Sequence, residues 1–135
     1  MDNIQFDSGL RSYRINGGEV LRFNPCDPNL YTRFLKSVEK LKALEENLMQ
    51  EAGENPGDDL VMLLSETDRK MKEILNWVFG AENDFHKLLG GVNLLAVAEN
   101  GERVVTNFFE ALEPVLIDGA KRCARQEAAK NRKAE

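Results

Sequence analysis

The sequence predicts an α+β fold that is predominantly α-helical: a small N-terminal antiparallel β-hairpin or three-stranded sheet packed on a bundle of three long helices, with short turns between them. Three observations lead to this prediction. Alternating apolar residues flank a glycine-rich turn near the N-terminus, apolar residues recur every three or four positions in three later stretches, and proline or glycine lies at the boundaries of those stretches. With 135 residues, 42% of them hydrophobic, the chain is long enough for one domain with its own core.

The hairpin is expected from Ser12–Ile15 and Glu19–Phe23, because Asn16–Gly18 between them tolerate the positive φ angles of a tight turn. Ile4 and Phe6 alternate in the same way and predict a third strand. A sheet this small must pack its apolar side on the helices. The side chains expected on that side are some combination of Tyr13, Ile15, Val20 and Phe23.

The first long helix is predicted to begin at Asp27 and Pro28, since aspartate caps the first free amides and proline already has a helical φ. Gly53 is the expected end, followed by a loop over Gly53–Gly57. Such a short connection predicts that the next helix is an antiparallel neighbour. The apolar stripe of the first helix consists of Leu30, Phe34, Val38, Leu41, Leu44 and Leu48.

The second long helix is expected from Asp59 to Phe79, with Gly80 ending it. At 100° per residue, Trp77 falls on the flank of its apolar stripe and Met62 falls behind it. One neighbouring helix does not cover both side chains. A second element or a partner is therefore required, unless Trp77 simply packs in the core against the hairpin.

Shorter elements follow in Asn83–Gly91, where Asn83 or Asp84 is the expected cap of one or two helical turns and His86 is expected to face solvent. Two alternatives remain open for Leu94–Val105. One is a hairpin around Asn100-Gly101, and the other is a short helical turn followed by a tight loop. The helical version is favoured because Asn93 can cap it.

The third long helix is predicted to begin near Val104 or Thr106, and Pro114 inside it predicts a kink or break near Glu110–Glu113. Residues 1–120 then form one globular domain, divided into a hairpin region (1–24) and a helical region (27–120). Residues 121–135 form a charged, fraying tail with six cations and two acids. This local charge of +4 leaves −9 for residues 1–120 of the total of −5.

Catalytic, metal-binding and cofactor-binding residues are not expected. His86 is the single histidine, and Cys26 and Cys123 lie 97 positions apart without metal-ligand spacing, so both cysteines are expected to be reduced. The common nucleotide, hydrolase and protease motifs are missing. Without a membrane-spanning apolar run or a signal peptide, we expect a cytoplasmic protein that binds partners rather than an enzyme.

Three regions together carry a resemblance: Val20–Pro25 with Asp27, Ile74–Gly80, and Gly90–Asn93 leading to Asn107–Pro114. With these, the chain resembles the small tail assembly chaperones, or closely related small tail-module proteins, of long-tailed bacteriophages and prophages of Gram-positive bacteria. The likeness covers about residues 10 to 120. It rests on patterns of fold and turn rather than on a chemical signature.

The resemblance implies a non-enzymatic protein of the bacterial host cytoplasm that coats the apolar, helical tape measure protein before the tail tube polymerises. It also implies contacts with other tail proteins, self-association, and a longer frameshifted product with its junction in the tail after Lys121. The apolar arcs of the helices are wider than one contact requires, which predicts surface available to a partner. The candidate partner-binding residues are Trp77, Phe79, Phe108, Phe109 and Leu112, although all five could instead lie in the core.

Two other functions remain as alternatives. A tail-completion or head–tail connector protein would persist in the mature virion. A nucleic-acid-binding regulator would use the basic residues of 121–135 to displace counterions from phosphate. No aromatic residues interleave with these cations, and a helix C-terminus favours cations anyway, which argues against nucleic acid.

Overall fold

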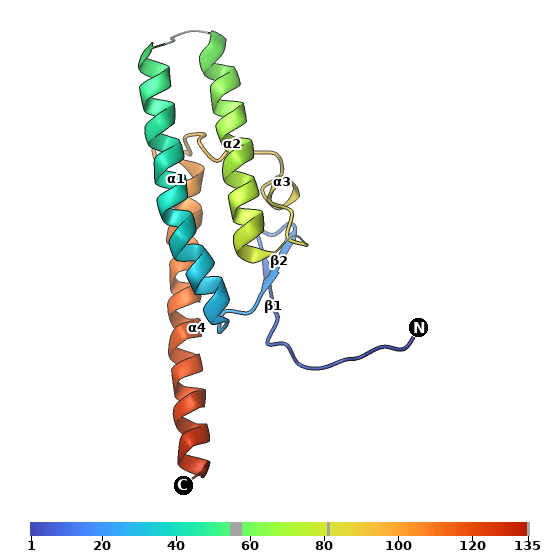
Figure 1. The fold of residues 1–135 in the computed structure, drawn as a ribbon. Coiled ribbons are helices and arrows are strands. Elements are labelled where there is room, and N and C mark those ends of the chain that lie inside the picture. The colour runs from blue at the N-terminus through green and yellow to red at the C-terminus, as the bar shows by residue number, and fades with distance from the viewer. Residues whose placement is uncertain (55–57, 81, 135) are drawn as a thin grey trace.

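Three long helices and one β-hairpin make up most of the chain in this computed structural model, which describes residues 1–54, 58–80 and 82–134. The predominantly helical α+β fold is confirmed, with the hairpin packed on helices (Figure 1). The elements are β1 (Arg11–Arg14), β2 (Val20–Phe23), α1 (Pro28–Glu54), α2 (Asp58–Phe79), α3 (Phe85–Leu88) and α4 (Val104–Ala134).

The sheet has two strands, β1 and β2, paired antiparallel with Tyr13 opposite Leu21. Asn16 (φ 49°) and Gly17 (φ 73°) supply the left-handed turn that the sequence predicts. The predicted third strand is wrong, because residues 1–10 are irregular and exposed. Gly9 (φ 75°) bends the backbone just before β1, so the preceding residues diverge from that strand instead of pairing with it (Figure 1).

The predicted start of α1 is confirmed. The Asn29 backbone amide donates a 2.9 Å hydrogen bond to Asp27 Oδ1, and Pro28 is the first helical residue. The helix runs one residue past Gly53, the expected end. Most of the predicted loop lies outside the described residues.

Helix α2 runs antiparallel beside α1, as expected from their short connection (Figure 1). It ends at Phe79, and Gly80 follows with φ 104°, which confirms the predicted stop. The Arg33 Nε atom of α1 donates a 2.9 Å hydrogen bond to the Val78 carbonyl. This bond satisfies one of the free carbonyls at the end of α2 and ties the two helices together there.

The segment after α2 forms the single turn of α3, capped by Asp84, whose Oδ1 accepts a 3.0 Å hydrogen bond from the His86 amide. His86 is exposed, as predicted. Residues 94–103 combine parts of both alternatives and form no helix. Asn93 caps one turn, as the favoured version predicts, with its Oδ1 accepting a 2.8 Å hydrogen bond from the Leu95 amide. An antiparallel bridge between Val97 and Arg103 then closes a hairpin-like loop around Asn100 and Gly101.

The sequence predicts a kink or a break at Pro114; helix α4 continues through this residue, so the break does not occur. Proline removes the amide that would bond to the carbonyl of Glu110, but both residues are exposed, so water can satisfy that carbonyl. The charged segment from Lys121 prolongs the same helix to Ala134. This part of α4 projects beyond the other elements (Figure 1).

The core lies where the hairpin, α1, α2, α3 and α4 converge. Met71, Leu75 and Val78 bring one side of α2 into it with no exposed surface. The other members that are less than one-twentieth exposed are Leu21, Phe23, Leu30, Leu41, Leu48, Phe85, Leu94 and Val105.

Candidate functional site

An aromatic cluster at the end of α2 joins four elements of the fold. The Phe79 ring lies 5.1 Å from Phe23 of β2, 5.5 Å from Phe85 of α3 and 6.5 Å from Phe108 of α4, measured between ring centroids. Phe79 is only 6% exposed, and it meets Phe23 and Phe108 edge to face and Phe85 at a tilt. In this conformation it offers almost no surface to a partner.

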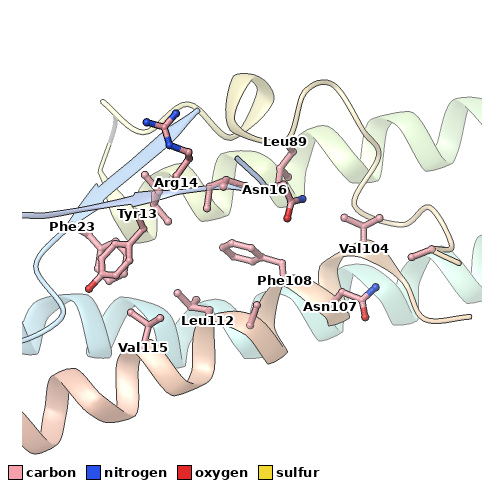
Figure 2. A pocket seen from close by; sticks show the side chains of 14 residues that line it. Tyr13, Arg14, Asn16, Phe23, Leu89, Val104, Asn107, Phe108, Leu112 and Val115 are labelled. Atoms are coloured by element: carbon pink, nitrogen blue, oxygen red, sulfur yellow. The ribbon is translucent and has the colours of Figure 1, made fainter. Parts of the chain in front are cut away.

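The hairpin groove is a hollow of about 430 Å³ between the hairpin, the loop before α4, and α4 itself. Figure 2 shows the Phe108 ring of α4 pointing toward the hairpin and the Arg14 guanidinium turned outward at the rim. Asn16 and Asn107 supply further polar groups, and none of the described residues that line the hollow is acidic. Its apolar lining comes from Tyr13, Ile15, Leu21, Phe23, Leu89, Ala98, Val104, Phe108, Ala111, Leu112 and Val115.

The hairpin wall of this groove is held in place by Asn83, which is 3% exposed. Its Oδ1 accepts a 2.9 Å hydrogen bond from the Arg22 amide, while its Nδ2 donates to the Arg22 carbonyl at 2.7 Å and to the Phe79 carbonyl at 2.8 Å. At Arg22, this one side chain therefore makes the two backbone hydrogen bonds that a third strand would make on the outer edge of β2. The sequence suggested Asn83 only as a possible helix cap.

The α1–α4 groove is a second hollow, of about 440 Å³, on another face of α4. Its floor is apolar and includes the Phe34 and Phe109 rings, which meet edge to face at 5.6 Å. From Phe34 to Glu45 it follows α1 for roughly 16 Å at 1.5 Å per residue. Its lining residues are Phe34, Val38, Leu41, Lys42, Glu45, Val105, Thr106, Phe109, Glu110 and Glu113.

A third, shallower hollow of about 360 Å³ surrounds Trp77 on the outer side of α1 and α2. Trp77 is 44% exposed, and Lys40 Nζ lies 4.4 Å from the centre of its ring. This cation–π contact covers part of the indole. The flank position predicted for Trp77 therefore leaves the side chain at the surface and not in the core.

The five candidate residues do not form one site. Phe108 and Leu112 line the hairpin groove, Phe109 lines the α1–α4 groove, and Trp77 lines the third hollow. Leu112 is 5% exposed, so it contributes mainly to the groove wall. Phe34 and Val38 were not among the predicted partner-binding residues, because their spacing on α1 is the same as that of residues in the core.

Cys26 and Cys123, far apart in sequence, meet where the start of α1 approaches α4. The Cys26 thiol donates to the Gly119 carbonyl at 3.2 Å, and the Cys123 thiol donates to the Cys26 carbonyl at 3.5 Å. Both cysteines are free. A hydrogen bond with the Cys26 side chain, followed by burial, raises the pKa of Cys123 above its ordinary value, so the thiol is less readily ionised.

Within residues 1–54, 58–80 and 82–134, no group of three or more His, Cys, Asp or Glu side chains is arranged to hold a metal ion. Among the helices described, none has the length and apolar character needed to span a membrane. No protein-family model, no curated protein and no solved structure matches the chain.

Proposed function

We propose that this protein is a non-enzymatic binding protein that shields an apolar helical segment of a partner, acting as a tail assembly chaperone for a phage tape measure protein. The resemblance of Ile74–Gly80 and Asn107–Pro114 to that family suggests the client. The observation that carries the proposal is the α1–α4 groove, an apolar channel about three helical turns long.

The groove has the chemistry of a helix-binding site. Val38 is half-buried on the groove floor between the Phe34 ring and Leu41, so an inserted apolar side chain would lose its contact with water. A helix with apolar residues at three- and four-residue spacing matches a channel of this length. This mode of binding needs no catalytic group.

The rim of the groove sets a preference for charge. Among the described residues, its charged side chains are three carboxylates, Glu45, Glu110 and Glu113, and one cation, Lys42. A client helix whose apolar stripe is flanked by lysine or arginine therefore complements it. Complementary rim charges act mainly on the association rate and on the choice of partner.

The direct test is co-expression with the tape measure protein from the same phage or prophage, followed by an affinity measurement on the purified complex. Val38→Asp should weaken binding by roughly tenfold or more, because a charge in the channel must be desolvated. Met62→Asp is the matched control, since Met62 is 73% exposed on α2 and outside the groove. Circular dichroism establishes that both variants fold.

Equal binding by the wild type and Val38→Asp would contradict the assignment of the groove. No binding of the tape measure protein by the wild type would contradict the proposed client. Mass spectrometry of purified virions separates a chaperone from a connector protein, because the chaperone should be strongly depleted from the finished particle.

A further inference from the structure

The first ten residues form an extended arm that leaves the body of the protein (Figure 1). Ile4 is 87% exposed and Phe6 is 76% exposed. In an extended chain these two side chains lie on the same face. Large apolar side chains exposed on an extended segment promote aggregation unless another protein surface covers them.

Two hydrogen bonds at the base of the arm fix its direction. Asn24 Nδ2 donates a 3.1 Å hydrogen bond to the Ser8 carbonyl, and the Gly9 amide donates a 2.9 Å bond to Asp7 Oδ1. Gly9 is needed here, since its φ is 75° and a Cβ atom would lie 2.6 Å from Asn24 Nδ2. These hydrogen bonds direct the arm outward from the Arg11 end of β1. The hairpin groove runs along the hairpin from Phe23, which pairs with Arg11, to Arg14 and Asn16 at the other end.

The exposed edge of the hairpin is suited to receive such an arm. Asn83 occupies the outer edge of β2, but among the described residues no backbone hydrogen bond is made along the outer edge of β1. An extended segment added to β1 would place alternate side chains on the sheet face that carries Tyr13, beside the groove.

We propose that the arm of one copy of this chain seats Ile4 and Phe6 in the hairpin groove of a second copy. The charges agree with this: among the described residues, Arg14 is the one charged residue that lines the groove, and the arm carries Asp2 and Asp7 without lysine or arginine. Each copy has one arm and one hairpin groove, so two copies can exchange arms around a twofold axis. The proposal is independent of the client site, because it uses a different groove.

The first test is the concentration dependence of molecular mass, measured by sedimentation or light scattering. The wild type should form dimers, and Phe6→Asp should weaken their association roughly 10- to 100-fold, the range for losing one buried aromatic side chain. Gln5→Asp is the matched control, since it adds the same charge on the opposite face of the arm and should leave the dimer intact. A variant on the groove side is Ala111→Arg, which fills the groove from α4 and should weaken the dimer as Phe6→Asp does. Gln5, Phe6 and Ala111 are all exposed, so none of the three substitutions should prevent folding.

A second test distinguishes exchange between copies from folding back within one copy. A photoreactive benzophenone side chain replaces Phe6, and unlabelled and ¹⁵N-labelled proteins are mixed before irradiation. Cross-linked peptides of mixed isotope content that join the arm to residues 108–115 are expected. A wild type that stays monomeric at all concentrations, dimers that survive Phe6→Asp, or cross-links confined to one copy would each overturn the proposal.

Discussion

Lys72 Nζ lies 2.9 Å from Asp68 Oδ2, one turn away on α2, and the Lys72 side chain is only 3% exposed. The same ammonium donates a 2.8 Å hydrogen bond to the Val92 carbonyl, while Asp68 Oδ1 accepts a 2.8 Å bond from the Leu94 amide. This buried pair therefore holds the loop between α3 and α4 against α2. The loop in turn sets where α4 begins, and so where both grooves lie.

Removing one member of this pair should be strongly destabilising. Lys72→Ala leaves Asp68 and the Val92 carbonyl without their partner, and we expect a loss of about 3–5 kcal/mol in the free energy of unfolding, measured by urea denaturation. The control is the pair of Arg69 and Glu73, which has the same spacing on the same helix but is more than half exposed. Arg69→Ala should cost less than about 1 kcal/mol, and equal losses in the two variants would refute the role of burial.

Two helical glycines should respond to alanine in opposite directions. A Cβ atom on Gly119 would lie 2.7 Å from Pro25 Cβ and closer still to the Pro25 carbonyl oxygen, so Gly119→Ala should lower the free energy of unfolding by about 1–3 kcal/mol. Nothing lies within 4 Å of the Cβ position at Gly53, near the end of α1. Gly53→Ala should raise stability by about 0.4–1 kcal/mol, and thermal unfolding of both variants checks the pair.

Stability should fall at alkaline pH partly through Tyr31. Its hydroxyl hydrogen-bonds to the carbonyl oxygens of Pro25 and Leu116, and burial, followed by the nearby Cys26, raises its pKa above the ordinary value. The contribution is complete below about pH 10, where the unfolded tyrosine is also protonated, and it is lost as the pH rises toward the folded pKa. The stability difference between wild type and Tyr31→Phe should therefore shrink above about pH 10. A difference that stays constant through that range would show that the hydroxyl does not titrate as described.

The thiol of Cys123 should react slowly with iodoacetamide in the folded protein. Its pKa is raised mainly by the hydrogen bond with the Cys26 side chain, so little thiolate is present near neutral pH. Cys26→Ala removes that bond and should move the pH midpoint of alkylation downward, toward that of an ordinary thiol. Mass spectrometry of the alkylated peptide measures the rate at each pH, and identical midpoints in the two proteins would contradict the assignment.

Local signals predicted most of the element boundaries. Asp27 and Pro28 start α1, Gly80 follows the end of α2, and Asp84 caps α3, because each depends only on backbone groups within a few residues. The predicted third strand was wrong because the direction of the arm depends on Asn24, which follows β2 and lies 16 positions after its partner Ser8 in the sequence. Of the kink or break predicted at Pro114, the break does not occur, because the exposed side of a helix can leave a carbonyl to water.

The candidate surface was predictable only in part. Helical spacing identified apolar residues that exceed what one neighbour can cover, but Phe34 and Val38 on α1 carry the same signal as the core residue Leu41. Which of them remain accessible depends on where α4 crosses α1. That crossing is set by long-range contacts, among them the Phe34 and Phe109 rings.

The sequence by itself determined the three long helices, the hairpin turn and the positions where α1 and α2 begin and end, because these follow from short-range spacing and capping. Only the tertiary structure decided that Phe79 is buried while Trp77, two residues earlier on the same helix, is 44% exposed. The physical reason is that α3, α4 and the hairpin pack around the end of α2 on the Phe79 side and leave the Trp77 side to Lys40 and water. The same packing creates the two grooves from residues that lie far apart in the chain.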